Sequence, residues 1–318
     1  MKEFKNILFP VDLSKTSAKM VPYVLLMANR FKSKIHLLFV VREFDHLTEI
    51  YVSKDTIRNF YTNIIEGCEK SLYEFQEKHF NQFSNTSSKV AIGDISEEIA
   101  KYIKSEKIDL MILGTHGRKG MDKIFFGSIA ERLLKTAMIP IFLVNPYRSK
   151  LSVPIDALKM NEANKLKIRK KPRILFAVDL SEISIKLVPF VELLAQKFQA
   201  EIHLITVVRP AGYFTTVYQE SHSLESFNDM IIDETKAKLI DFKNQNFNGF
   251  PDAKAHVDYG DIPEEIIDHI NDKKIDFLVM GTHGRKGIDK ILFGSVAERV
   301  AKTSPVPILL INPYRLNS

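Results

Sequence analysis

The sequence predicts an α/β protein built of two tandem Rossmann-like domains, each an open five-stranded parallel sheet with helices on both faces. Three observations lead to this prediction. Short apolar runs alternate with amphipathic segments of helical length, the whole alternation occurs twice, and a glycine-rich stretch over 114–128 returns over 281–295, offset by 167 residues. The length of 318 residues also suits two domains of about 150 residues each.

In the first repeat, the expected strands are short apolar, β-branched runs, and the expected helices repeat apolar residues every three or four positions. The predicted elements are a strand over 6–11, a helix over 15–31, a strand over 34–41, a helix with an apolar stripe between 57 and 75, an edge strand over 85–92, a helix over 95–104, a strand over 108–113, a helix from 128, and a strand over 139–144. Ser14 or Asp12 can cap the helix over 15–31, and Pro22 inside it should bend it or displace its start.

The second repeat follows in the same register, with strands over 173–178, 201–208 and 306–311. Pro189 stands in the place of Pro22, and Ala177 replaces Pro10. Residues 149–171 have no counterpart. We therefore predict a first domain over 1–148, a basic linker over 149–171 and a second domain over 172–318.

The composition is that of an ordinary globular protein, with 45% hydrophobic and 26% charged residues. The single cysteine, Cys68, excludes an intramolecular disulfide and falls on an apolar helix stripe, where we expect core packing. No apolar run approaches the roughly 20 residues that span a bilayer, and the first strand begins at once. We expect a cytoplasmic protein without membrane contact.

A net charge of +6 raises the question of nucleic-acid binding. The excess is concentrated in the linker region, where a solvated segment is the favoured interpretation. The six cationic residues concerned are Lys165, Lys167, Arg169, Lys170, Lys171 and Arg173. Nucleic acid is therefore not an expected partner.

The repeated glycine stretch is the strongest indication of a binding site. Over 114–132 and 281–299, only three of 19 positions differ, and all three are exchanges of one apolar residue for another. Each stretch follows a buried strand and leads into a helix, and Ser128 followed by Glu131 has the form of a capping box. A helix N-terminus preceded by glycines is suited to bind a phosphate. The spacing is neither that of a Walker A loop nor that of a G-x-G-x-x-G dinucleotide fingerprint.

Other residues follow the carboxyl ends of predicted strands, and ligands of doubly wound sheets bind at this edge. Asp12 follows the first strand, Val40 and Val41 end the second, and Gly114 ends the fourth. We expect these residues to converge on one crevice with the helix that begins at Gly127 and Ser128.

These residues carry a family resemblance that covers nearly the whole chain. The chain resembles a tandem universal stress protein, because both halves contain the G-x2-G-x9-G-[ST] motif of the family's ATP-binding members. The endings Asp12-Leu-Ser14 and Asp179-Leu-Ser181 of the first strands also look like those of the family, although Leu13 and Leu180 stand where glycine or phenylalanine is also common.

The resemblance implies a strand order of 3-2-1-4-5 and ATP bound at the switch point of each sheet. Asp12 and Asp179 would contact the ribose or the phosphates and could hold Mg²⁺ with them; no other protein metal site is expected. The residues implied at the nucleotide are Pro10, Asp12, Val40, Val41, Gly114, Gly117, Gly127, Ser128 and Ile129 in the first half, and Asp179, Val207, Val208, Gly281, Gly284, Gly294, Ser295 and Val296 in the second. The valines would line the adenine, and the motif glycines and serines would hold ribose and phosphates.

The resemblance also implies that domains pair through their last strands. The two halves would then form an internal pseudo-dimer by joining 141–144 to 308–311. A homodimer of two chains and an unidentified protein partner are further expectations of the same kind.

The expected function is ATP binding in a stress response, through nucleotide-dependent conformation or partner binding and with slow hydrolysis at most. No second acid accompanies Asp12 by motif, so no phosphoryl-transfer site is recognisable. Two alternatives stay open: a nucleotide-free adaptor, and a Mg²⁺-dependent ATPase or nucleotide-activating ligase. His116 and His283 lie between motif glycines, but no second ligand stands near them at metal-binding spacing, so a structural metal is not expected there.

Overall fold

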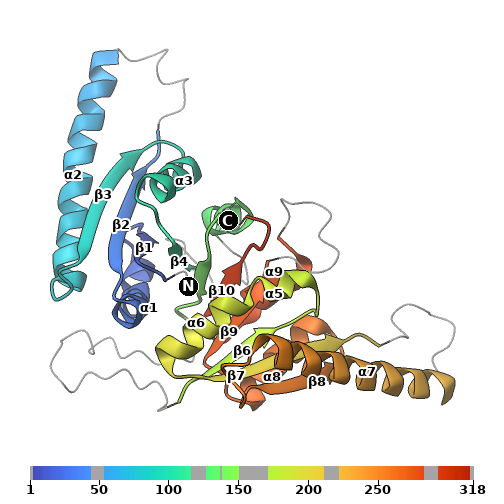
Figure 1. The fold of residues 1–318 in the computed structure, drawn as a ribbon. Coiled ribbons are helices and arrows are strands. Elements are labelled where there is room, and N and C mark those ends of the chain that lie inside the picture. Colours follow the sequence, from blue (N-terminus) through green and yellow to red (C-terminus); the bar gives the residue numbers. More distant parts are fainter. Residues whose placement is uncertain are drawn as a thin grey trace. The chain divides into compact units, whose positions relative to one another are not determined.

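The computed structural model describes residues 3–43, 54–115, 127–136, 138–149, 171–210, 222–282 and 293–315. These residues belong to two compact units, one within 3–146 and the other made of 147–149 and 171–315 (Figure 1). Most of the predicted linker, 150–170, lies outside the described residues, so its limits stay a prediction.

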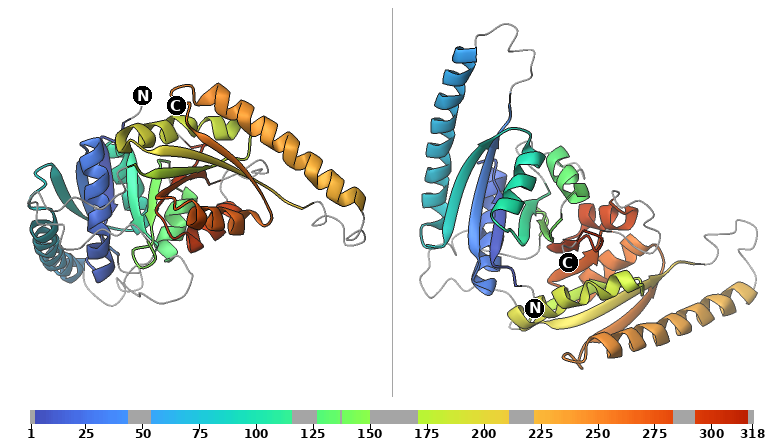
Figure 2. Two further views of the ribbon diagram at one scale, coloured as in Figure 1. Left: turned by 90° about the horizontal axis from the view of Figure 1, so that it is seen from below. Right: turned by 45° about the horizontal axis from the view of Figure 1, so that its top comes forward.

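The first unit has the predicted alternation of strands and helices. Its elements are β1 (Asn6–Pro10), α1 (Lys15–Phe31), β2 (Lys34–Val41), α2 (Lys54–Phe80), β3 (Thr86–Ile92), α3 (Ile95–Ser105), β4 (Leu110–Gly114), α4 (Ser128–Thr136) and β5 (Ile141–Val144). All strand pairs are parallel and follow the order β3-β2-β1-β4-β5, which confirms the predicted order and the edge position of β3. Helices α1 and α2 cover one face of the sheet, and α3 and α4 cover the other (Figure 2).

The second unit repeats this topology. Its elements are β6 (Arg173–Ala177), α5 (Glu182–Ile185), α6 (Val188–Phe198), β7 (Glu201–Val208), α7 (His222–Asn246), β8 (Lys254–Tyr259), α8 (Ile262–Asp272), β9 (Phe277–Gly281), α9 (Ser295–Thr303) and β10 (Ile308–Ile311). The strands lie parallel in the order β8-β7-β6-β9-β10. The predicted pairing of the two halves through β5 and β10 stays a prediction.

The first helix of each half shows what the shared proline does. Ser14 caps α1, with its side chain accepting hydrogen bonds from the N–H groups of Thr16 and Ser17, and α1 runs through Pro22 without a break. In the second half the helix is divided, and α6 begins at Val188 with Pro189 in its first turn. Of the two predicted effects, Pro189 displaces the helix start and Pro22 does not; a bend at Pro22 stays a prediction.

The core of each unit is formed by the central strands, whose side chains are almost completely buried on both faces. Ile7, Leu8 and Phe9 of β1 are at most 2% exposed, and Ile174, Leu175 and Phe176 of β6 are 0% exposed. Burial on both faces is the pattern expected of parallel strands between two helix layers.

The apolar stripe of α2 is only partly buried. Leu72 and Phe75 pack into the core, but Phe60, on the same predicted stripe, is 46% exposed. Cys68 is half-buried rather than enclosed. Helix α2 has 27 residues and the neighbouring strand β3 has 7, so at about 1.5 and 3.3 Å per residue the helix is longer than the strand that it packs against. Among the described residues, no helix is both long enough and apolar enough to cross a membrane.

Candidate functional site

The predicted site residues that the structure describes gather at the carboxyl edge of each sheet. In the first unit, β1 lies between β2 and β4, and the chain reverses its direction of travel across the sheet at this point. Pro10 ends β1, Val41 ends β2 and Gly114 ends β4, so all three lie at the same edge. This is the topological switch point at which doubly wound sheets bind ligands.

Asp12 is held in place by the start of α1. Its Oδ1 accepts hydrogen bonds from the Ser14 N–H at 3.0 Å and from the Ser17 hydroxyl at 2.6 Å. The Asp12 N–H in turn donates to Ser17 Oγ at 3.2 Å. The carboxylate is thus oriented by groups of its own turn, and Leu13 between them has a left-handed φ of 59°.

Asp179 repeats this arrangement with one more donor. Its Oδ1 accepts from the Ser181 N–H at 3.1 Å and from the hydroxyls of Ser181 and Ser184, each at 2.6 Å. Its Oδ2 is buried and has no hydrogen-bond partner among the described residues. A buried carboxylate oxygen without a donor is costly, so this atom is positioned to bind a ligand hydroxyl or a cation.

The helix that follows the glycine stretch begins at the same edge. The Gly127 N–H donates to the carbonyl of Thr115 at 3.3 Å, and the Gly294 N–H donates to that of Thr282 at 2.8 Å. These bonds close the loop between β4 and α4, and between β9 and α9, at its two ends. The start of each helix is thereby fixed next to the end of the central strand before it.

The expected capping box is not formed. Both helices begin at the predicted serine, but in α9 the N-cap residue is Gly294, and no side chain caps the helix. Ser128 and Ser295 are exposed first residues of α4 and α9. The Glu131 N–H donates to the Gly127 carbonyl at 3.0 Å, so Gly127 rather than Ser128 precedes the first turn of α4, and the Glu131 side chain pairs with Lys135 at 2.7 Å. The first N–H groups of α9 therefore have no competing side chain, which favours binding of an anion there.

Of the remaining predicted residues, some border the edge of a sheet and the others lie outside the described residues. Side chains that border the edge are partly exposed: Pro10, Val40, Val41, Ile129, Val207 and Val296. Val208 is 9% exposed and Ala177 borders the edge of the second sheet in place of Pro10. Gly117, Gly284, His116 and His283 lie outside the described residues, so the structure brings together only the two ends of each motif.

Two pairs of residues in this region were missed by the sequence analysis. Ser17 and Ser184 each stand five positions after the aspartate that they orient, and Thr115 and Thr282 provide the carbonyls that close the loops. The identical spacing in both repeats was a signal that could have identified the serines.

Comparisons with known proteins agree with this architecture. The model of the universal stress protein family matches the chain twice, over residues 3–145 and 172–312. A universal stress protein E homolog of Haemophilus influenzae is 23% identical over 98% of this chain and 99% of its own length. A universal stress protein of Methanocaldococcus jannaschii is 30% identical over 44% of this chain and 81% of its own length.

A solved structure supports the fold at full length. The crystal structure of a universal stress protein from Archaeoglobus fulgidus covers 98% of this chain and 100% of its own, with a TM-score of 0.66 and 20% identity. At that identity the likeness supports the fold alone. The two family matches together span well over half of the sequence, one for each structural unit. The chain therefore belongs to the universal stress protein family, as a tandem member with two such domains.

Proposed function

We propose that each half of the chain binds ATP, with or without Mg²⁺, at the carboxyl edge of its sheet, and that the protein acts in a stress response through nucleotide-dependent conformation or partner binding. We expect slow hydrolysis at most, because no second acid that could hold a metal or a water for phosphoryl transfer accompanies Asp12 or Asp179 by motif.

The observation that carries this proposal is the environment of Asp179. Its Oδ1 is held by three donors, while its buried Oδ2 has none. A ribose hydroxyl or a Mg²⁺ ion on the phosphates would satisfy this oxygen. The uncapped start of α9 and the closing bond from Gly294 to Thr282 support the same ligand, because they direct backbone N–H groups to the same edge.

The residues proposed to hold the nucleotide are those of the two edges. Asp12 and Asp179 would contact ribose or Mg²⁺. Val41 and Val208, with the valines before them, would line the adenine, and the N-termini of α4 and α9 would bind phosphates. Gly117 and Gly284 complete the proposed sites from the motif alone.

Nucleotide content and stoichiometry test the proposal. The full chain is purified without added nucleotide, denatured, and its supernatant separated by anion exchange; the stripped protein is then titrated with ATP by calorimetry. We expect two ATP per chain, one after either Gly127→Arg or Gly294→Arg, and none after both. Gly249→Arg is the matched control, because Gly249 lies in an exposed turn with nothing within 4 Å of an added Cβ. It should leave two sites.

Asp179→Asn separates a ligand-binding role from a structural one. The change removes the buried charge but keeps the shape of the side chain, so ATP binding in the second half should weaken by roughly 10- to 100-fold, the loss of one charged hydrogen bond. Thermal stability without ATP should not fall. Absence of ATP, ADP and AMP binding in both halves would overturn the proposal and leave the adaptor. Rapid Mg²⁺-dependent turnover that Asp12→Asn and Asp179→Asn abolish would identify an ATPase instead.

A further inference from the structure

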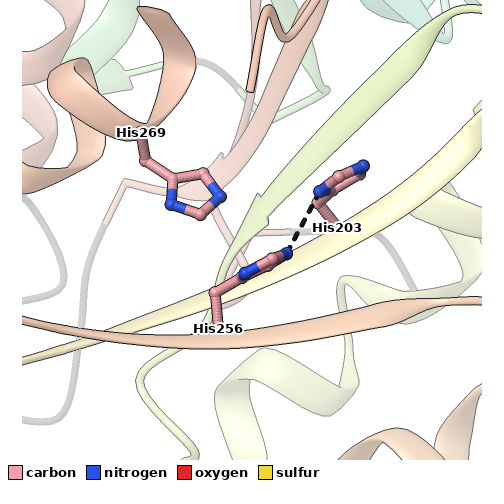
Figure 3. Close-up of side chains that lie close together, drawn as sticks. All are labelled: His203, His256 and His269. Atoms are coloured by element: carbon pink, nitrogen blue, oxygen red, sulfur yellow. Dashed lines mark hydrogen bonds between the residues drawn. The ribbon is translucent and has the colours of Figure 1, made fainter. Parts of the chain in front are cut away.

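A cluster of three histidines in the second unit lies away from the proposed nucleotide edge. His203 is on β7, His256 is on β8, and His269 is in the last turn of α8 (Figure 3). His256 pairs in register with Ile205, two positions along β7 from His203, so both side chains project from the same face of the sheet, where α8 packs. One ring nitrogen of each histidine lies within 4.8 Å of one from each of the others.

The distances suit a metal ion. His203 Nδ1 and His256 Nε2 are 3.2 Å apart. Two imidazole nitrogens bound to tetrahedral zinc at 2.0–2.1 Å would be separated by about 3.3 Å. The first pair is therefore already at ligand spacing, and the third ring would complete the set by a small side-chain rotation.

Two carboxylates lie behind the rings, and one of them forms a hydrogen bond. Asp258 Oδ2 accepts from His269 Nδ1 at 2.9 Å, which places the proton on Nδ1 and leaves a lone pair on Nε2. Glu201 Oε1 lies 3.5 Å from His203 Nε2 without a hydrogen bond, and a proton on Nε2, facing this carboxylate, would leave the lone pair on Nδ1. The lone pairs of His203 and His269 are thus directed inward, and a carboxylate behind the imidazole is the common second shell of a metal-bound histidine.

The cluster lacks a partner at its centre. His269 Nε2 is buried and has no hydrogen bond, while the His269 side chain as a whole is 5% exposed. With the His203 proton on Nε2, the 3.2 Å contact is a hydrogen bond from His256 Nε2–H to His203 Nδ1. Binding of a cation would require His256 to move its proton to Nδ1, with no change in the charge of the ring, and His269 to rotate towards the other two rings.

Charge and burial are consistent with neutral ligands. Burial lowers the pKa of His203 and of His256 to about 4, so both rings are neutral at physiological pH. Of the nearby cations, Lys254 and Arg173 both pair with Glu201, and the charge of Lys273 contributes to the lowered pKa of His256. Half-buried His256 on the edge strand β8 gives the cluster its opening to solvent.

We propose that His203, His256 and His269 form a binding site for one divalent transition-metal ion, with Zn²⁺ as the preferred ion. Three imidazoles leave a fourth coordination position for water or another ligand. The proposal concerns a different part of the unit from the nucleotide edge and does not depend on ATP binding.

The first half provides an internal control, because its corresponding positions hold other residues. At the same offset of 167 residues, His203 corresponds to His36, His256 to Lys89 and His269 to Tyr102. There, His36 Nδ1 contacts the Tyr102 hydroxyl at 3.1 Å, and Lys89 Nζ lies 5.6 Å from the centre of the Tyr102 ring. One imidazole, a phenol and an ammonium group cannot form this site, although the backbone is the same.

The test is metal stoichiometry on the full chain, stripped with chelator and free of nucleotide. Equilibrium dialysis against Zn²⁺ with elemental analysis should give one ion per chain, and Co²⁺ should show the visible absorption of a tetrahedral site with nitrogen ligands. His256→Lys and His269→Tyr introduce residues that the fold already accepts in the first half, and each should abolish stoichiometric binding. Asp258→Ala should weaken binding by roughly 10- to 100-fold.

Two controls make the outcome decisive. His36→Asn should leave one ion bound, and Lys89→His combined with Tyr102→His should add affinity for a second ion. The proposal is overturned if the stripped protein binds no Zn²⁺ while circular dichroism shows it folded. It is equally overturned if binding survives His256→Lys and His269→Tyr but disappears with His116→Asn and His283→Asn, since the ion would then be bound by the loops.

Discussion

Replacing Gly93 by alanine should destabilise the first unit, whereas the same replacement at Gly67 should stabilise it. Gly93 joins β3 to α3 with a φ of +143°, a conformation that is essentially restricted to glycine, and its N–H binds the carbonyl of Val41 at 2.9 Å. Gly67 lies inside α2, and nothing is within 4 Å of an added Cβ. The two substitutions are chemically identical and lie in the same unit.

The expected free-energy changes follow from these geometries. Holding alanine at the backbone conformation of Gly93 costs about 1–3 kcal/mol. The new Cβ would also meet Glu98 Cγ at 3.1 Å, and displacing that side chain disturbs its ion pair with the exposed Lys101, which adds little. At Gly67, alanine gains about 1 kcal/mol of helix propensity. The two variants should therefore differ by roughly 2–4 kcal/mol.

Native-state hydrogen exchange read by mass spectrometry is the suitable assay, because it reports on each half of the full chain separately. The slowest amides of β1 and β4 give the opening free energy of the first unit, and those of β6 and β9 should not change. The reasoning is refuted if both substitutions shift the first unit equally, or if Gly93→Ala leaves it unchanged. The left-handed turn would then not require glycine.

Two further predictions concern local electrostatics. Asp94 caps α3 by accepting hydrogen bonds from the N–H groups of Ser96 and Glu97. Asp94→Ala should therefore lower the free energy of unfolding, measured with urea, by about 1 kcal/mol. Arg132→Ala removes only the exposed partner of Asp94 and should lower it less. Burial raises the pKa of Asp109 from 3.8 to about 6, so the folded state binds its proton more tightly than the unfolded state does. The wild type should therefore gain stability relative to Asp109→Asn as the pH falls from about 6 towards 3.8, and a constant difference between the two urea midpoints would contradict this.

Much of the fold could be predicted because the local patterns agree with the global topology. The helix over 15–31 and the strands over 34–41 and 201–208 have the predicted bounds, since each apolar pattern ends at a clear change of composition. A displaced start was predicted for both helices, but the sequence could not tell that it occurs only at Pro189, because Pro22 stands in the same place of the other repeat. Bonds to the third residue back, from the Lys186 and Leu187 N–H groups to the carbonyls of Ile183 and Ser184, form the break between α5 and α6.

The candidate sites were predictable to different degrees. Both edges were located by motif, but the cap at Gly294 was not, because a serine and a glycine at a helix start are both good N-caps and only the backbone geometry decides between them. The three histidines are separated by 53 and 13 positions, and no local pattern connects them. The register of β8 against β7 and the last turn of α8 bring them together, and these are tertiary facts.

The two units differ at one set of corresponding positions, and this has a consequence for how the sequence of such a protein can diverge. The positions hold His36, Lys89 and Tyr102 in the first unit and His203, His256 and His269 in the second. Two identical chains in a dimer must carry any substitution twice or not at all. A gene that encodes both units in one reading frame allows each to diverge alone, and it fixes their ratio at one to one in every molecule synthesised. The tandem arrangement thus makes a lasting asymmetry possible without a second gene or a mechanism that sorts unlike subunits.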